Sequence, residues 1–309
     1  MPATMLRPLS LGELLDRTFS LYKENFLLFF GVMVWPSLLA IAVGLLNTTL
    51  QTMVLKPGVK NAAVAGVGIA GAMLLFMFAY WVAYTIALGA TTFAVSDVYL
   101  GRTATIAESY RKMRGSVWRL MRLFGYIAVQ IFAVMVLMII AISLVSVLGA
   151  AVGIAAMVIL LPALFVVPVW LMLRYSVAVP ALMLETLKAR PAARRSVQLM
   201  KGNFGRGFLL ILLMVIIGIV TAMVFQGPFM AAAILMANKG QPSVLLLGLG
   251  TVSGGLGGAL AAPLIMIGLV LLYYDIRVRK EAFDLQLLMG PPIESISGDS
   301  PAAAAAPSM

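Results

Sequence analysis

Three acidic residues stand at the ends of long apolar segments, and each is followed five positions later by a base. The acids are Asp97, Glu185 and Asp275. Carboxylates can act as general acids or bases, but the chain contains no His and no Cys, which excludes imidazole catalysis, thiol nucleophiles and the usual zinc or haem ligands. We therefore predict no catalytic site, no metal site and no cofactor. Two interpretations of the acids stay open: ion pairs with bases such as Arg17 and Arg195 that seat neighbouring helices, or a functional role at a membrane rim.

Arg174 is the one basic residue placed well inside an apolar span. It lies eleven residues before Glu185, which on a straight helix is about 16 Å and places the guanidinium near mid-bilayer. A cation there costs at least about 2.5–3.5 kcal/mol on insertion scales, so it needs a partner. The candidates are a bound anion or lipid phosphate, or structural partners: carbonyls freed by Pro168 or Pro180, and the side chains of Asn47, Gln130 and Gln226.

Two glycine patterns have simple structural interpretations. Gly66–Gly71 fits the GxGxxG pattern of dinucleotide sites, but that pattern needs a preceding strand and here it opens an apolar helix. Gly250, Gly254 and Gly258 form a stripe of small residues at helical spacing. Such stripes let helix backbones approach closely, so the stripe predicts packing inside a bundle or, alternatively, a homodimer face.

The composition indicates a membrane protein. Of 309 residues, 62% are hydrophobic and 11% are charged, whereas soluble domains carry roughly 25% charged residues. Uncharged apolar runs predict six transmembrane helices, each long enough to cross roughly 30 Å of hydrocarbon. The predicted spans are 26–50, 64–96, 119–148, 153–184, 207–237 and 245–275.

The basic residues predict the orientation. They concentrate before the first span, in the second and fourth connections and after the last span, while the opposite side holds only Lys56, Lys60 and Lys239. Because Lys and Arg accumulate in cytoplasmic loops, we expect both termini in the cytoplasm. The net charge of +11 is thus explained by a membrane surface, and no nucleic-acid partner is predicted.

A basic amphipathic helix is predicted before each odd-numbered span. Ser10 with Glu13 and Thr105 with Glu108 form capping boxes for the first two helices. Residues 11–26 and 189–204 share five identities without gaps. We therefore predict an all-α fold of three tandem units, each an interfacial amphipathic helix plus a helical hairpin, over about 8–100, 101–188 and 189–289. Together 1–289 form a single transmembrane domain, and 290–309 is predicted to be a disordered cytoplasmic tail.

Four sequence blocks resemble a family of bacterial six-helix proteins named for the membrane domain of glycerophosphoryl diester phosphodiesterase. The blocks are RPLSLGELLD at 7–16, the segment from Arg174 through Pro180 to Glu185, RSVQLMKGNF at 195–204 and YYDIRVRKEAF at 273–283. In the full-length enzymes of that name, cleavage belongs to a separate domain with metal-binding carboxylates and histidines. The resemblance therefore implies a module of the bacterial inner membrane without phosphodiesterase activity.

The leading functional hypothesis is a non-enzymatic protein that interacts with anionic lipid or acts as an accessory or scaffold component. Its partners would be membrane lipids, a second copy of the chain or another membrane protein. The alternative is a transporter or exporter of an anionic amphiphile or small solute, with Arg174 on the route. The candidate lipid contacts are Arg17, Lys23, Arg111, Arg114, Arg194, Arg195 and Lys201.

Overall fold

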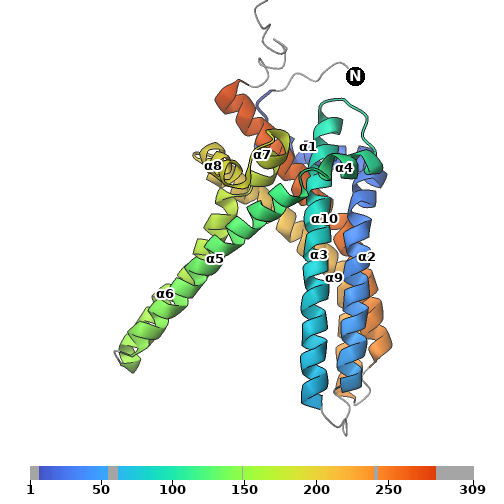
Figure 1. The fold of residues 1–309 in the computed structure, drawn as a ribbon, viewed down its shortest axis with the longest axis vertical. Helices are drawn as coiled ribbons and strands as arrows, with labels where there is room; N and C mark the ends of the chain where they lie inside the picture. The colour runs from blue at the N-terminus through green and yellow to red at the C-terminus, as the bar shows by residue number, and fades with distance from the viewer. Residues whose placement is uncertain (1–6, 55–61, 148, 240–242, 283–309) are drawn as a thin grey trace, which may run out of the picture.

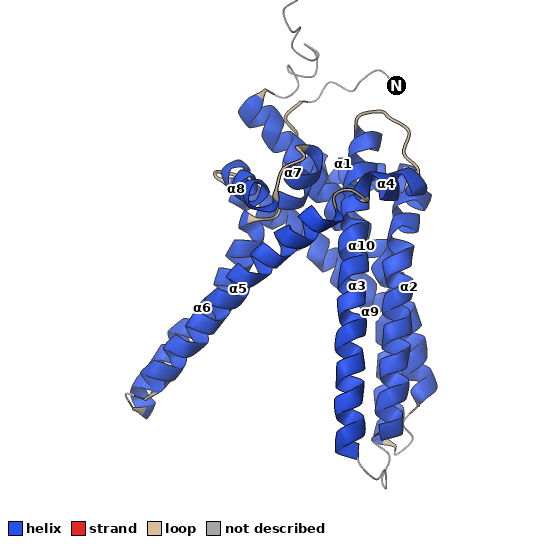
Figure 2. Ribbon diagram, in the orientation of Figure 1, coloured by secondary structure: helices blue, strands red, loops and turns tan. Residues whose placement is uncertain are grey.

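The computed structural model describes residues 7–54, 62–147, 149–239 and 243–282, and the predicted tail at 290–309 lies outside this part. The described part consists of helices joined by turns and short loops, and it contains no strand (Figure 2). Its helices are α1 (Leu11–Glu24), α2 (Phe26–Val54), α3 (Ala62–Tyr99), α4 (Ile106–Met113), α5 (Val117–Ser146), α6 (Ala150–Arg174), α7 (Ala178–Leu184), α8 (Ala189–Met200), α9 (Phe204–Asn238) and α10 (Val244–Glu281).

Six segments of the described part are long and apolar enough to cross a membrane. They coincide with the predicted spans, so the predicted all-α, polytopic membrane fold is confirmed. The helix ends differ from the predictions by a few residues, except in α6, which ends ten residues before the predicted end at 184, and in α10, which runs six residues past the predicted end at 275. That extension carries the charged residues Arg277, Arg279 and Lys280 on a helix that continues beyond its apolar part.

Three bodies are distinguishable in Figure 1. Helices α2, α3, α9 and α10 form a main bundle, in which α10 contacts α2, α3 and α9. The hairpin of α5 and α6, hereafter the arm, diverges from the main bundle (Figure 1). The short helices α1, α4 and α8 gather at one end of the molecule, hereafter the basic end (Figure 1). The arm therefore joins the rest of the protein mainly near the basic end.

Glycines in α10 let it pack closely against two neighbours. A methyl group built at Gly250 would lie 3.2 Å from Phe229 Cβ of α9, and one at Gly254 would lie 3.0 Å from Gln226 Oε1 of the same helix. Gly258, the third member of the predicted stripe, faces nothing within 4 Å. The stripe therefore packs inside the bundle at its first two positions, as one interpretation expected, but not at the third.

Hydroxyl groups compensate for one of the prolines inside the spans. Pro36 lacks an N–H, so the carbonyl of Val32, four residues earlier, loses its helical donor. Tyr110 of α4 donates its hydroxyl to that carbonyl at 2.6 Å. The proline of α2 thereby becomes an attachment point for the surface helix α4, because the freed backbone group needs a partner inside a membrane.

The three surface helices bury matching positions. Thr18 of α1, Ser109 of α4 and Ser196 of α8 occupy aligned positions of the predicted units, and all three are buried. The capping box of Ser10 and Glu13 is complete. In the second box only the Thr105 side chain accepts a bond, from the backbone of Glu108. These features agree with similar folding of the three helices, while the tandem relationship of the units remains a sequence prediction.

The fourth predicted span is broken, and there the sequence prediction of a single helix over 153–184 is wrong. α6 ends at Arg174, a turn follows, and α7 begins at Ala178. Pro180 is the third residue of α7, a first-turn position that its fixed φ and missing N–H suit. α6 alone has 25 residues, about 37 Å at 1.5 Å per residue, which is enough to cross the hydrocarbon core.

Candidate functional site

Asp97, near the end of α3, holds the surface helix α4. Lys112 of α4 donates to Asp97 Oδ2 at 2.6 Å, and the Asp97 side chain is only 9% exposed. Lys112 also approaches Glu108 at 3.4 Å one turn earlier on the same helix. The hydrogen bond to Asp97 raises the pKa of Lys112 above its usual value. This carboxylate thus fixes α4 against the main bundle.

Glu185, directly after α7, holds the surface helix α8. Arg195 donates Nε to both carboxylate oxygens at 3.0 and 3.1 Å, and its Nη2 donates to Glu281 of α10 at 2.7 Å. Tyr273 donates its hydroxyl to Glu185 Oε1 at 2.8 Å. The Glu185–Arg195 pair is one of the pairings expected from the sequence, and it connects α8 to the end of α7 and to α10.

Asp275 of α10 holds the segment that leads into α1. Its side chain is fully buried, and Oδ1 accepts the backbone N–H of Leu9 at 2.7 Å. Arg206 of α9 pairs with Oδ2 at 2.9 Å and Arg279 does so at 3.1 Å. Both arginines also donate to the Leu9 carbonyl. Two arginines and one carboxylate therefore satisfy both backbone groups of Leu9.

The three acids follow one pattern. Asp97 of the first predicted unit contacts the surface helix of the second, and Glu185 of the second contacts that of the third. Asp275 of the third contacts Leu9, two residues before α1 of the first. The contacts thus form a closed series around the basic end, in which each acid holds the next surface helix in place.

Arg174 is the last residue of α6 and lies beside α8, within the apolar segment Pro162–Leu184 that is long enough to cross a membrane. The straight helix from Arg174 to Glu185 assumed from the sequence is interrupted by a turn at 175–177. Ser196 of α8 donates to the Arg174 carbonyl at 3.0 Å. The guanidinium lies over the Trp170 ring, 5.2 Å from its centroid. Of its proposed partners, Gln130 lies in the same groove but accepts a hydrogen bond from Tyr175.

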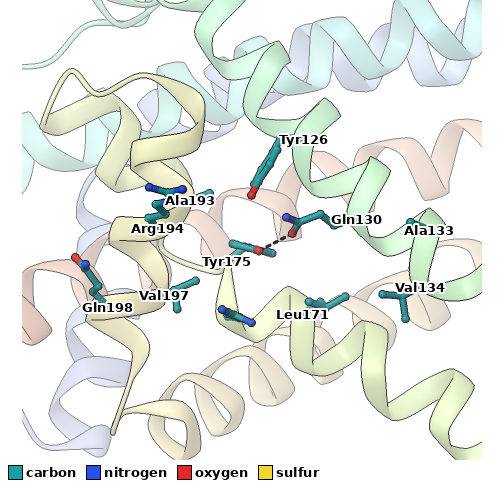
Figure 3. A pocket seen from close by; sticks show the side chains of 11 residues that line it. Tyr126, Gln130, Ala133, Val134, Leu171, Tyr175, Ala193, Arg194, Val197 and Gln198 are labelled. Carbon is teal, nitrogen blue, oxygen red and sulfur yellow. Dashed lines mark hydrogen bonds between the residues drawn. The ribbon is translucent and has the colours of Figure 1, made fainter.

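A groove of about 630 Å³ opens between α5, the end of α6 and α8 (Figure 3). Its charged residues are Arg174 and Arg194, and it contains no Asp or Glu. Tyr126, Tyr175, Gln130 and Gln198 supply polar groups, while its apolar lining is Ala133, Val134, Leu171, Ala193 and Val197. The groove therefore combines cationic and hydrogen-bonding groups with an apolar wall, in the size range of small-molecule sites.

The other predicted lipid contacts divide into exposed and half-buried residues. Lys23, Arg111, Arg114, Arg194 and Lys201 are exposed on or beside the surface helices. Arg17 is half-buried near Tyr99, and none of the ion pairs described involves it. The pairing of Arg17 with a rim acid, which the sequence suggested, is therefore absent from the described part of the chain.

Sequence reasoning missed Arg206 and Lys112 as partners of Asp275 and Asp97. It also missed Glu281, an acid that shares Arg195 with Glu185. Arg206 reaches Asp275 from a different helix, and no local pattern indicates that contact. Glu281 had a usable signal, because it stands four residues after Arg277 on one helix and pairs with it at 3.0 Å. Lys280 donates to the carbonyls of Gln198 and Lys201 at the end of α8, where a cation complements the helix dipole.

The remaining patterns contribute no site. Gly66–Gly71 lies inside α3 and follows no strand in the described chain, so it does not form a dinucleotide loop. No group of three or more acidic residues that could hold a metal ion occurs among the residues described. At the basic end Asp97, Glu185 and Asp275 are paired, while the exposed acids Asp16 and Glu24 and several exposed bases take part in none of the described ion pairs.

This fold and this site define the class: an integral membrane protein with six apolar helices and a basic end built from three amphipathic helices. Residues 151–286 match the family model described as the membrane domain of glycerophosphoryl diester phosphodiesterase. The family resemblance predicted from the sequence is thereby confirmed, on the part of the chain from α6 to α10. No curated protein and no solved structure matches the chain.

Proposed function

We propose that the protein is a non-enzymatic component of a bacterial plasma membrane whose basic end binds anionic lipid. The observation that carries the proposal is a set of exposed bases at one end of the molecule that take part in none of the described ion pairs. These bases are Lys23, Arg111, Arg114, Arg194 and Lys201. Each cation near an anionic membrane surface contributes about 1 kcal/mol of attraction.

The paired bases have a different role from the unpaired ones. Arg195 and Lys112 point to buried or half-buried carboxylates and hold the surface helices in place. Arg194 and Arg111 are their neighbours in sequence, and both are exposed and take part in none of the described ion pairs. Lys112 is exposed as well, but it is bonded to Asp97. On each of these helices, one base thus pairs with a carboxylate of the protein, while its neighbour in sequence is available to the membrane. This arrangement supports a lipid-binding function for the unpaired bases.

The proposal places the basic end and both termini in the cytoplasm, in keeping with the distribution of Lys and Arg. Because the chain has no Cys, single cysteines report orientation without background. Arg114→Cys should react with a membrane-impermeant maleimide only after cell lysis, whereas Lys239→Cys should react in intact spheroplasts. Labelling of Arg114→Cys in intact spheroplasts would contradict the proposed orientation.

Catalysis is not part of the proposed role. The matched family model bears the name of an enzyme but describes its membrane domain, and the chain has no His or Cys. The transporter alternative rested on a cation at mid-span. Arg174 lies inside the apolar segment Pro162–Leu184, but it lines a groove between α5, α6 and α8 and not the interior of the main bundle, so no specific observation favours a route through the bundle.

Native mass spectrometry of the protein released from bilayers of equal phosphatidylglycerol and phosphatidylcholine tests the lipid proposal. We expect the retained lipid to be enriched several-fold in phosphatidylglycerol. A triple substitution of Lys23, Arg114 and Lys201 by Gln should reduce the enrichment. The matched control replaces Lys56, Lys60 and Lys239, which the sequence places on the opposite side. Equal retention of the two lipids by the native protein would refute the proposal.

A further inference from the structure

We propose that the groove between α5, α6 and α8 is a specific site for one anionic phospholipid, whose phosphate lies between Arg174 and Arg194. This inference rests on the proposed lipid function and adds to it a defined position and stoichiometry. The groove has a volume of about 630 Å³ and would be a defined site. The exposed bases of α1 and α4 would instead contact the membrane surface without a defined site.

The charge of the groove argues for a phosphate. Arg174 and Arg194 both line it, and no acidic side chain does. Neither arginine takes part in an ion pair with the described residues, in contrast to Arg195, which binds both Glu185 and Glu281. Two guanidinium groups without carboxylate partners form an anion site, because Arg presents a planar set of donors that matches phosphate oxygens.

The depth of the groove argues for a lipid. Trp170 with Arg174 on α6 and Trp118 with Arg122 on α5 form two cation–π pairs at the base of the arm, at 5.2 and 5.4 Å. Trp side chains concentrate at the membrane–water interface, level with the lipid headgroups. The two pairs are typical of headgroup depth at the base of the arm, and the groove extends from there along α5 to Ala133 and Val134, inside the apolar span Val117–Val145.

The apolar wall of the groove can contact the acyl chains of the bound phospholipid. Ala133 and Val134 of α5 and Leu171 of α6 lie on the side of the groove toward the arm (Figure 3). Beyond them the arm exposes large apolar side chains such as Leu137 and Val166. A headgroup at the arginines would thus leave its chains along a surface that is already apolar.

Polar residues complete the headgroup environment. Tyr175 donates its hydroxyl to Gln130 Oε1, which orients the amide so that its NH₂ group stays available as a donor. Tyr126 and Gln198 lie on opposite walls of the groove (Figure 3). These neutral groups can bind the glycerol or ester oxygens of a lipid, whereas the two arginines bind its phosphate.

The test measures phosphatidylglycerol binding by native mass spectrometry for the native chain and two double variants. Arg174→Gln with Arg194→Gln removes the groove cations, and Arg111→Gln with Arg114→Gln removes two exposed cations from α4. We expect one tightly held phosphatidylglycerol on the native chain. The groove variant should bind it about tenfold more weakly, roughly the loss of one charge-assisted contact, and the α4 variant should retain it.

Three results would overturn the inference. Equal weakening in both double variants would mean that diffuse charge holds the lipid, which leaves the broader lipid proposal intact. Displacement of phosphatidylglycerol by sn-glycerol 3-phosphate would identify a water-soluble phosphate as the ligand. Unchanged binding in Arg194→Glu, an exposed position whose substitution leaves the buried contacts of α8 in place, would exclude Arg194 from the site. Absence of phosphatidylglycerol enrichment on the native chain would instead refute the proposed function itself.

Discussion

Helix α10 of the main bundle and helix α5 of the arm are both long and apolar, yet they pack very differently. In α10, 56% of the most apolar window is buried inside the protein, whereas in α5 none of the corresponding window is. α10 has seven glycines and α5 has one. Inside a membrane, lipid competes with helices for apolar surface, so close backbone approach decides which helices associate.

Individual glycines of the two helices show the same contrast. Gly255 of α10 faces Ile41 of α2 so closely that a methyl group there would overlap Ile41 Cγ1. Gly125 of α5 faces nothing within 4 Å. α10 is therefore held by close contact with a neighbouring helix, while α5 leaves large apolar side chains such as Phe132 and Leu137 exposed.

Asp275→Ala should be the most damaging change. It leaves Arg206 and the Leu9 N–H without their buried partner, which costs about 3–5 kcal/mol. Arg122→Ala at the base of the arm loses only a cation–π contact with Trp118, about 0.5–1 kcal/mol. Free energies of unfolding from steric trapping in bilayer mimetics would check this. Equal losses would show that the arm is anchored as firmly as α10.

Ile267→Ala and Ile139→Ala compare the same truncation in the two bodies. Ile267 of α10 is fully buried, whereas Ile139 of α5 is 53% exposed. We expect Ile267→Ala to lower the free energy of unfolding by about 2–5 kcal/mol, because it leaves a cavity in the main bundle. Ile139→Ala should cost much less, since lipid fills the space. The same measurement of the free energy of unfolding tests this prediction. A large loss of stability for Ile139→Ala would mean that the arm packs against another protein surface.

Gly255→Ala and Gly125→Ala add one methyl group in each body. Overpacking against Ile41 should destabilise Gly255→Ala by about 1–3 kcal/mol. Gly125→Ala should be neutral or slightly stabilising, because Ala has the higher helix propensity. Gly258→Ala, which meets nothing within 4 Å, is the control on α10 itself. If Gly258→Ala were as harmful as Gly255→Ala, close packing would not be the cause.

The smallest effect concerns the capping box of α1. The Ser10 backbone N–H, followed by Arg7, lowers the pKa of the Glu13 carboxyl from 4.5 to about 2. A lowered folded-state pKa means that Glu13 stabilises the helix fully above pH 4.5 and loses this contribution as the pH falls toward 2. Amide hydrogen exchange in the first turn of α1 should therefore speed up over that range, once corrected for intrinsic rates. Glu13→Gln should abolish this change. A transition in Glu13→Gln like that of the native chain would assign it to another group.

The sequence predicted the spans well because apolar runs and basic connections are strong local signals. The turn after Arg174 was missed, since Leu173 and Val177 on either side continue the apolar run. Pro180 was the available clue, because a proline fits the first turn of a new helix. The contacts of Asp275 with Arg206 and Leu9 could not be predicted, because they join residues that only the folded chain brings together. Lys112 was likewise not predicted as the partner of Asp97.

The bond between the Leu9 backbone and Asp275 spans 266 positions of the chain. It cannot form until α10 has been synthesised and inserted. The segment leading into α1 therefore reaches its final contacts only after nearly all other helices have been assembled. Completion of the last helix is thus also the step that fixes this early segment. A chain arrested before α10 would leave Leu9 unbound and accessible to the quality-control proteases of the cell.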